Sequence, residues 1–324
     1  MPVPLSTRIA VVIPCLNEEL TIAGVVDSFR AELPAAEIVV IDNASEDRTA
    51  TISLEHGATV LREERRGKGN AVRTAFREVD ADVYVMVDGD ATYPAESIRD
   101  LIAPVIADRA DMVVGTRLDA ESESEFRAIN RAGNQLLLMA VNSVFGARMT
   151  DLLSGYRVMT REFVRQVPLL SAGFEVETEL SIMALERGFR VVEFPVRLAA
   201  RPRGSRSKIR IWRDGLRIMN AILTLFRDYR PLSFFGSLGI LSMLVGLGPG
   251  IFVTIEFMEQ GTVRIPTAVL ATGLETVGFT FLLTGVVLAA LSRRFREIDY
   301  RLDRIQAASA KRRVTDEGAV GGPR

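Results

Sequence analysis

Two carboxylates stand one residue apart in the stretch VYVMVDGDATYP, residues 83–94. An apolar run typical of a buried strand ends there in Asp88-Gly89-Asp90, where Gly89 permits a sharp exit of the backbone. Carboxylate oxygens are hard ligands suited to Mg²⁺ or Mn²⁺, which usually bind through one or two carboxylates plus substrate phosphates. The pattern therefore indicates a metal site whose partner is a diphosphate, although a solvated turn has the same sequence.

Other polar residues follow the preceding apolar runs. Asp42 ends EIVVID, and Asn17 and Glu18 follow the first run in IPCLNEE. Such side chains accept hydrogen bonds from a ribose or a base, and they also suit the start of a helix, where Asn17 is a good N-cap. Lys68 lies in GKG without the frame of a P-loop. We interpret that segment as a loop near the donor phosphates.

Short β-branched runs must position these residues. The expected strands cover 8–14, 37–42, 58–61, 83–87, 111–115 and 189–196. Segments with helical spacing of apolar residues alternate with them, at 18–33, 69–80, about 127–146 and 175–187. This alternation predicts an α/β fold with a mostly parallel sheet and helices on both faces, and ligands bind at the carboxyl ends of such strands.

Composition narrows the class of protein. A net charge of −1 gives no global attraction to nucleic acid, although residues 201–230 carry nine Lys/Arg against Asp214 and Asp228. The single cysteine, Cys15, excludes an internal disulfide and fits a reducing compartment. The single histidine, His56, cannot build a histidine metal cluster, and we expect it to be structural.

The C-terminal third predicts a membrane hairpin. Residues 232–255 carry no charge, and residues 266–291 are interrupted only by Glu275, so both exceed the roughly 20 residues that span a bilayer. Arginines flank the pair outside and Arg264 alone lies between, which places both ends in the cytoplasm. Glu275 is a candidate functional residue, an interface residue or an oligomer contact. The basic stretch 209–231 predicts an amphipathic juxtamembrane helix, and the tail after Ile305 a frayed helix followed by disorder.

Seven motifs occur in the order seen in family 2 glycosyltransferases of the GT-A fold. They are IPCLNEE, VVIDNASEDRT, RGKGNAVRTAF, VDGDATYP, VVGTR, DLLSGYRV and RPRGSRSK. More narrowly, the chain resembles polyprenyl-phosphate sugar synthases, similar to dolichol-phosphate mannose synthase and to bacterial undecaprenyl-phosphate glucosyltransferases. The expected organisation is a Rossmann-like GT-A domain over 1–208, the juxtamembrane helix over 209–231, two membrane helices within 232–292, and a cytoplasmic tail over 293–324.

The resemblance implies a role for each motif residue. Donor-binding positions fall on Pro14, Asn17, Glu18, Asp42, Lys68, Asp88 and Gly89. Metal-binding positions fall on Asp88 and Asp90, with Thr92 or water as a third ligand, since Ala91-Thr92 replaces the Leu-Gln of relatives. Catalytic positions fall on Asp90, Asp151 and Arg157, and acceptor-phosphate positions on Arg117, Arg201, Ser207 and Lys208. Outside the motifs, Arg131 lies in an expected helix after the acidic loop DAESESEF and is a further candidate for the acceptor phosphate. Arg131 equally suits a solvent-facing position.

These expectations define a metal-dependent, inverting transfer of a hexose from a nucleotide sugar to a polyprenyl phosphate at the cytosolic membrane face. Mg²⁺ or Mn²⁺ is the expected cofactor, and UDP-glucose or UDP-N-acetylglucosamine is favoured over GDP-mannose because DGDATY departs from the mannose-synthase pattern. Bacterial relatives suggest a homotetramer in the plasma membrane. The alternatives are a GDP-mannose enzyme, a processive polysaccharide synthase and a non-catalytic membrane adaptor. The processive synthase lacks support because no Gln-x-x-Arg-Trp motif is present. A dinucleotide oxidoreductase is excluded because no Gly-x-Gly-x-x-Gly follows the first strand.

Overall fold

Apolar strands form the centre of the N-terminal part of the chain. The computed structural model describes residues 7–118, 138–139, 141–143, 145–173, 175–199, 219–220, 223–224, 226–228 and 230–320, with side chains up to Arg294. Within these residues the chain divides into two compact units, 1–223 and 224–324. Each unit is described by itself.

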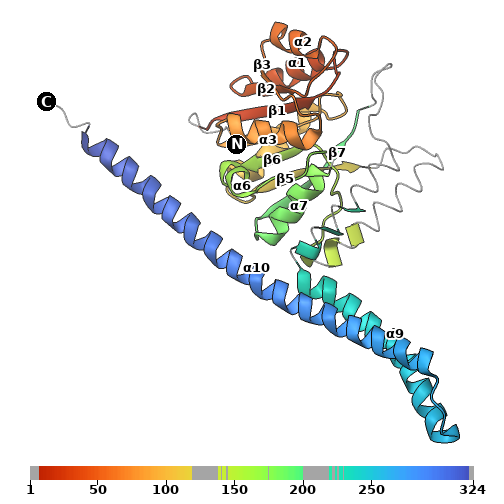
Figure 1. Ribbon diagram of the computed structural model, residues 1–324. Coiled ribbons are helices and arrows are strands. Elements are labelled where there is room, and N and C mark those ends of the chain that lie inside the picture. Colours follow the sequence, from red (N-terminus) through yellow and green to blue (C-terminus); the bar gives the residue numbers. More distant parts are fainter. Residues whose placement is uncertain are drawn as a thin grey trace. The chain divides into compact units, whose positions relative to one another are not determined.

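One sheet runs through the first unit in the order β3-β2-β1-β4-β6-β5-β7 (Figure 1). Its strands are β1 (Ile9–Cys15), β2 (Glu37–Asp42), β3 (Thr59–Arg62), β4 (Val83–Met86), β5 (Met112–Leu118), β6 (Arg157–Thr160) and β7 (Val191–Arg197). The six strands expected from the sequence are confirmed, and the fold is the mostly parallel α/β sheet that was predicted.

Strand β6 was not predicted, and it changes the order of the sheet. It lies between β4 and β5 and runs antiparallel to both, with Arg157 opposite Met86 on one side and Val114 on the other. Because β6 points the other way, its beginning lies at the edge where β4 and β5 end. The loop 151–156 that leads into β6 is therefore delivered to the carboxyl edge of the parallel strands, where ligands bind in such folds.

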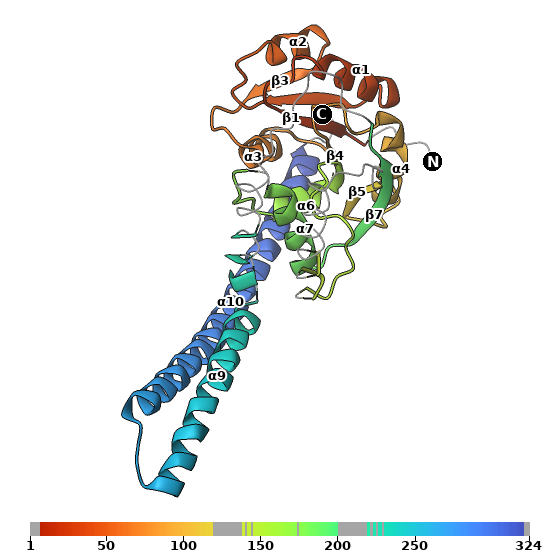
Figure 2. The same cartoon turned by 90° about the vertical axis from the view of Figure 1, so that its right-hand side faces the viewer.

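Helices cover both faces of this sheet, as the alternation of elements predicts. One side is packed by α1 (Ile22–Glu32) and α4 (Ile98–Ile106), whose apolar residues join those of β1, β4, β5 and β6 in a continuous core. The other side carries α3 (Lys68–Glu78) and α7 (Val176–Glu186), and Figure 2 shows α3 and α4 on opposite sides of the sheet. The remaining elements are α2 (Thr49–Glu55), the 3₁₀ turn η1 (Ala95–Ser97) and α6 (Arg161–Gln166).

The second unit is an antiparallel hairpin of α9 (Pro231–Gln260) and α10 (Ile265–Val320). Glycines let the two helices approach closely, since a Cβ on Gly278 would lie 2.5 Å from Met243 Cγ and 2.8 Å from the Gly239 carbonyl oxygen. Gly261 ends α9 in the left-handed conformation at φ 68°, and the turn that follows is closed by an Arg264–Glu256 ion pair of 2.8 Å. Small residues at such a seam are typical of helices that pack in membranes.

Two stretches of the hairpin are long and apolar enough to cross a bilayer, Pro231–Gln260 and Ile265–Arg294. Only 11% of the most apolar part of each stretch is buried, whereas a core helix of a soluble protein is mostly buried. The two helices suggest membrane association on length and composition. Glu275 lies on the seam rather than facing away from it, because a Cβ on Gly246 would be 3.3 Å from Glu275 Oε1.

The C-terminal tail differs from its expectation. A frayed helix followed by disorder was expected after Ile305, whereas α10 continues without a break to Val320. The tail is rich in alanine and in charged residues that favour helix, and the apolar half of α10 supplies a nucleus from which the helix propagates. The juxtamembrane helix expected over 209–231 lies largely outside the described residues.

Candidate active site

The carboxyl ends of β1, β2 and β4 meet at one edge and carry the predicted donor-binding residues. Cys15 pairs in register with Asp42, and the Val87 amide after β4 donates to Val12 of β1. Thr21 Oγ1 donates to the Gly89 carbonyl at 2.7 Å, joining the segments that follow β1 and β4. The polar residues that follow these strands are thus brought to one place.

Gly89 is required for a different reason from the one expected. It does not adopt a positive φ; the positive φ in this turn belongs to Ala91, at 58°. A Cβ on Gly89 would instead lie 2.5 Å from Cys15 Sγ. Glycine therefore allows the turn after β4 to lie against β1.

The turn between β1 and α1 corrects one expected role of Asn17. The residue that precedes α1 is Thr21, so Asn17 does not cap that helix. Asn17 instead adopts φ 53°, accepts from the Glu46 amide at 2.7 Å and donates its own amide to Ser45 Oγ at 3.0 Å. It therefore joins the loops after β1 and β2. Asp42 is buried at the end of β2 and accepts from the Ser45 amide at 3.2 Å. Pro14, in β1, and Glu18, in the segment after β1, are half-buried at the same edge.

Asp88 belongs to a buried cluster of charges. Its carboxylate contacts the ammonium of Lys68, whose Nζ also lies 2.5 Å from Glu177 Oε1 on α7. Burial opposes the charge on Lys68, but the two carboxylates outweigh it and raise the pKa of the ammonium, which stays charged at neutral pH. Burial also raises the pKa of Glu177, and Glu177 Oε2 has no hydrogen-bond partner among the described residues.

Asp90 lies in a tight turn next to this cluster. Its Oδ1 accepts from Thr92 Oγ1 at 2.6 Å and from the Thr92 amide at 3.2 Å, and the residue is 7% exposed. The predicted third metal ligand, Thr92, is therefore a hydrogen-bond partner of Asp90. Both residues sit at the same turn, as their spacing predicts.

Arg117 and Asp151 form a forked ion pair at the end of β5. Arg117 Nε and Nη2 lie 2.7 and 2.8 Å from the two Asp151 carboxylate oxygens. Burial opposes the charge on Asp151, yet the hydrogen bonds and charge of Arg117 hold its pKa below the usual range. Glu193 of β7 accepts the amides of Thr150 and Asp151 at 2.9 and 3.2 Å, which fixes the loop carrying Asp151.

Arg157 was expected to be catalytic, but its side chain is fully buried and not open to a substrate. Nε donates to the Ser154 carbonyl at 3.0 Å, and Nη2 donates to the Leu152 carbonyl at 3.0 Å and to Ser181 Oγ at 2.9 Å. Burial lowers its pKa to about 10, so the guanidinium remains charged at neutral pH. The structure therefore favours a positioning role, in which Arg157 ties the loop 151–155 to helix α7.

The same loop reaches the aspartates through Gly155. Its amide donates to Tyr93 Oη at 3.0 Å, and a Cβ on Gly155 would lie 2.6 Å from Asp88 Oδ2. Burial, followed by the nearby Asp88 charge, raises the pKa of Tyr93, which therefore stays protonated at neutral pH. Gly155 is thus a place where the backbone must approach a carboxylate.

We expect Gly155→Ala to lower transferase activity roughly 10-fold or more, because a shift of about 1 Å in a reacting group is this costly. The added methyl would push the Asp88 carboxylate out of its place. Initial rates at saturating acceptor would be compared with those of Gly24→Ala, where a Cβ meets nothing within 4 Å. Wild-type rates in Gly155→Ala would contradict this account of the site.

A second network holds the loop that leads to Lys68. Asn43 Oδ1 accepts the Gly67 amide at 2.6 Å, and Asn43 Nδ2 donates to the carbonyls of Glu63 and Arg65 at 3.1 and 2.8 Å. Glu63 is 6% exposed, and its carboxylate accepts from Arg65 Nε at 2.9 Å and from Thr74 Oγ1 at 2.6 Å. These bonds, led by that from Arg65, lower the pKa of Glu63 to about 2.

The Glu63 network predicts acid-sensitive stability. Because the folded pKa of about 2 lies below the usual value of roughly 4.3 for an unfolded chain, the stabilisation is present above that value and lost as the pH falls toward 2. We expect Glu63→Gln to lower the urea concentration at the midpoint of unfolding at pH 7. We also expect this midpoint to decrease less in the variant than in wild type as the pH falls from about 4.5 to 2. Urea titrations of the detergent-solubilised chain at several pH values would measure this. An unchanged pH profile in Glu63→Gln would show that other carboxylates carry the acid sensitivity.

Glu177 was missed in the sequence, although its helix was predicted. Acids in a helix are usually solvent-facing, and EVETEL gives no reason by itself to bury them. The available signal was that residues 176–184 are small, apolar or uncharged on every side of the helix apart from Glu177 and Glu179, which is typical of a helix buried all round. Arg131, Arg201, Ser207 and Lys208 lie outside the described residues, so their acceptor roles remain predictions.

The donor set suits a metal shared with a substrate. No group of three acidic, histidine or cysteine side chains able to hold an ion is present among the described residues. Asp88 and Asp90 offer two carboxylates, and Mg²⁺ or Mn²⁺ commonly completes such a pair with phosphate oxygens and water. The residues therefore fit an ion that arrives with a diphosphate better than one held by the protein alone.

Together, the sheet and this edge define the GT-A class of nucleotide-sugar glycosyltransferases, and comparisons with known proteins agree. The glucosyl-3-phosphoglycerate synthase of Mycobacterium tuberculosis, solved with Mn²⁺ and UDP-glucose, superposes with a TM-score of 0.59 at 22% identity, covering 68% of this chain and 79% of that one. The model of "Glycosyl transferase family 2" matches residues 10–167.

Curated relatives extend the match along the chain. Glycosyltransferase AglJ of Haloferax volcanii is 31% identical over 94% of this chain and all of its own length. The dolichyl-phosphate hexose transferase of the same organism is 32% identical over 68% of this chain and 95% of its own. The chain belongs to glycosyl transferase family 2, as its motifs predict, and it is a glycosyltransferase.

Proposed function

We propose that this enzyme transfers a hexose, with inversion and in a metal-dependent reaction, from a nucleotide sugar to a polyprenyl phosphate at the cytosolic face of a membrane. UDP-glucose and UDP-N-acetylglucosamine are the favoured donors. The observation that carries the proposal is a diphosphate-type site, with Asp88, Asp90 and Lys68 at one sheet edge, in a chain with two helices of membrane-spanning length.

The donor end of the site is supported by its charges. Asp88 and Asp90 would hold Mg²⁺ or Mn²⁺, which supplies Lewis-acid stabilisation of the leaving nucleotide diphosphate when bound. Lys68 adds a fixed positive charge beside Asp88 for the same anion. Asn17, Glu18 and Asp42 lie at the adjoining strand ends and would bind the nucleoside. The solved neighbour with Mn²⁺ and UDP-glucose favours the same pairing.

The acceptor end needs cations more than it needs a strong base. The second pKa of a phosphate monoester is about 6, so a lipid phosphate is largely an anionic nucleophile at neutral pH. Arg117, oriented by its ion pair with Asp151 at the end of β5, is proposed to contact the lipid phosphate, together with the predicted Arg201 and Lys208. Attack in line with the departing nucleotide would give a β-linked product from an α-linked donor. The relative named for dolichyl-phosphate hexose transfer supports this acceptor.

Two alternatives remain open to test. A GDP-mannose donor would be bound by the same carboxylates and cations, because these groups interact with the diphosphate and not with the base. A non-catalytic adaptor is disfavoured because the Asp88, Asp90 and Lys68 arrangement is intact. We also propose a multi-pass protein of the plasma membrane with a cytoplasmic catalytic domain, which the arginines flanking the hairpin support. A homotetramer is part of the same proposal.

The test is a donor and acceptor panel with purified full-length protein in detergent. UDP-glucose, UDP-N-acetylglucosamine and GDP-mannose would each be incubated with undecaprenyl or dolichyl phosphate and Mg²⁺ or Mn²⁺. We expect a metal-dependent glycolipid, detected by mass spectrometry, with β-configuration by NMR. Transfer to a soluble phosphate such as 3-phosphoglycerate, with none to lipid, would overturn the acceptor. Nucleotide binding without transfer to any acceptor would favour the adaptor.

A further inference from the structure

The start of helix α3 is interlocked with the backbone of residues 169–173, which precede α7. A Cβ on Gly67 would lie 2.1 Å from the Ala172 carbonyl oxygen, and one on Gly69 2.1 Å from that of Ser171. The Gly69 amide donates to the Gly173 carbonyl at 3.1 Å. The two backbones therefore touch on either side of Lys68, where no side chain fits between them.

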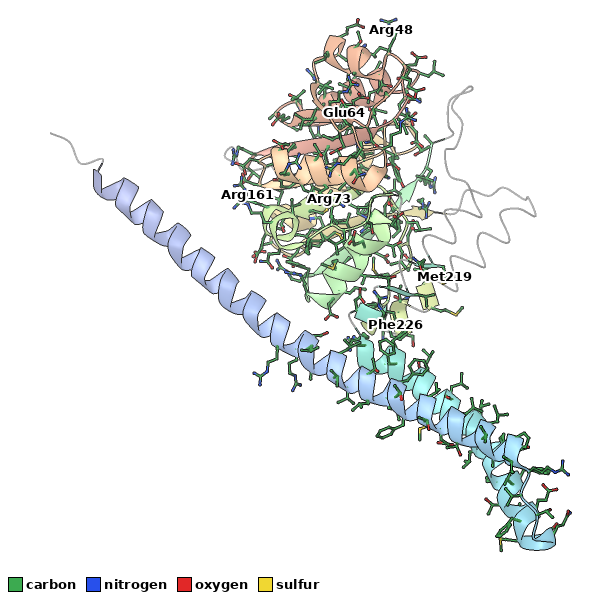
Figure 3. The ribbon with its side chains drawn as sticks, viewed as in Figure 1. Arg48, Glu64, Arg73, Arg161, Met219 and Phe226 are labelled. Carbon is green, nitrogen blue, oxygen red and sulfur yellow. The ribbon has the colours of Figure 1, made fainter. Side chains whose placement is uncertain are left out.

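Segment 169–173 is bound by charged side chains from both neighbouring helices. Arg73 projects from α3 and is labelled in Figure 3. It donates to the carbonyls of residues 169, 170 and 171 at 2.9, 3.0 and 3.1 Å. From α7, Glu179 accepts the amides of Leu170 and Ser171 at 2.9 Å each. Glu179 is 2% exposed, and both of its carboxylate oxygens are used in these bonds. We call this arrangement the Arg73–Glu179 clamp.

The clamp connects the two helices that carry the buried charge cluster. Lys68 is the first residue of α3, and Glu177 lies on α7 two residues before Glu179. The Lys68–Glu177 contact of 2.5 Å therefore depends on the spacing of α3 and α7 at this point. That spacing is set by a backbone segment whose carbonyls bind one helix and whose amides bind the other.

We propose that Arg73 and Glu179 are positioning residues that fix the Lys68 ammonium for the donor diphosphate, an inference that rests on the proposed function. Charge-assisted hydrogen bonds are short and directional, so five of them hold the segment in one place. With the backbone of Lys68 fixed, its side chain contacts Asp88 and Glu177 at a defined point of the sheet edge. Neither Arg73 nor Glu179 contacts Asp88 or Asp90 in the contacts described.

The clamp is tested by measuring the binding of UDP in the presence of Mn²⁺ to the full chain in detergent, by isothermal titration calorimetry. We expect Arg73→Gln to weaken binding roughly tenfold, because misplacing a binding group by about 1 Å has effects of this size or larger. Arg77→Gln is the matched control, since Arg77 is exposed on the same helix and pairs only with the adjacent Glu78 in the contacts described. It should bind like wild type.

A double-mutant cycle separates positioning from a general loss of structure. If Arg73 acts through Lys68, Arg73→Gln should add less than about twofold to the loss already caused by Lys68→Ala. Full additivity of the two losses would overturn the inference, as would unchanged binding in Arg73→Gln. Should Arg73→Gln fail to fold, Glu179→Gln, which keeps one acceptor oxygen, takes its place in the same cycle. Absence of nucleotide binding by wild type would overturn the proposed function and this inference with it, whereas wild-type binding with an additive cycle overturns the inference alone.

Discussion

Asp90→Asn is expected to reduce hexose transfer by about 100-fold or more, the loss typical when a charge that stabilises a leaving group is removed. In the wild-type structure Asp90 Oδ1 accepts from the Thr92 amide at 3.2 Å and from the Thr92 hydroxyl at 2.6 Å. Asparagine keeps an oxygen that can accept both bonds. The turn at residues 90–92 should therefore keep its shape, so the loss would report the missing negative charge. Initial rates with saturating lipid phosphate, across a Mg²⁺ or Mn²⁺ titration, measure it.

The chain offers a matched control for this change. Asp47 occurs in the same Asp-x-Thr arrangement, with Oδ1 accepting from the Thr49 amide at 3.0 Å and from its hydroxyl at 2.5 Å. Asp47→Asn makes the same chemical change in a similar turn away from Asp88. We expect it to stay within about threefold of wild type, since the half-buried Asp47 keeps an acceptor oxygen for Thr49 and none of its described contacts is with Asp88 or Asp90. Wild-type activity in Asp90→Asn at every metal concentration would refute the metal assignment.

The part of the fold that could be predicted is the part with a local signal. The parallel strands are mainly apolar runs rich in β-branched residues, and polar residues such as Asp42 at the end of β2 and Asp88 after β4 mark their carboxyl ends. Strand β6 lacks this signal, because RVMT begins with a charged residue and has only Val158 and Met159 as apolar residues. Its antiparallel insertion between β4 and β5 depends on pairing with strands far away in sequence, which no local pattern records.

The candidate site divides in the same way. Asp88, Asp90 and Lys68 are readable as single motif residues, but their grouping with Glu177 requires α3 and α7 to meet, and that follows from the interlocked glycines. Arg157 in SGYR was assigned a catalytic role from its motif, and nothing in the sequence indicates its burial, because fully buried arginines are rare. Its burial becomes understandable only once β6 is known to lie inside the sheet, with carbonyls from loop 151–155 within reach of its guanidinium.

Arg157→Met tests whether that buried guanidinium holds the loop carrying Asp151. Methionine fills much of the same volume without a donor, so the carbonyls of Leu152 and Ser154 would be left without their bonds in a buried place. An unsatisfied buried polar group costs roughly 1–3 kcal/mol, so we expect the free energy of unfolding to fall by about 3 kcal/mol. The buried charge itself has a desolvation cost that methionine removes, which is why the expected loss is smaller than the sum over all the bonds of Arg157.

This loss is measured by unfolding the full chain in detergent with urea. The unfolding of the first unit is followed by far-ultraviolet circular dichroism. Arg165→Gln is the control, because Arg165 lies nearby in sequence with a side chain 66% exposed and is expected to change stability by less than about 0.5 kcal/mol. Transfer rates well below the melting temperature should also fall in Arg157→Met, since the loop that it holds brings Gly155 against Asp88. A variant as stable as wild type but inactive would instead mean that Arg157 reaches the substrate, and would return it to the catalytic role first assigned from its motif.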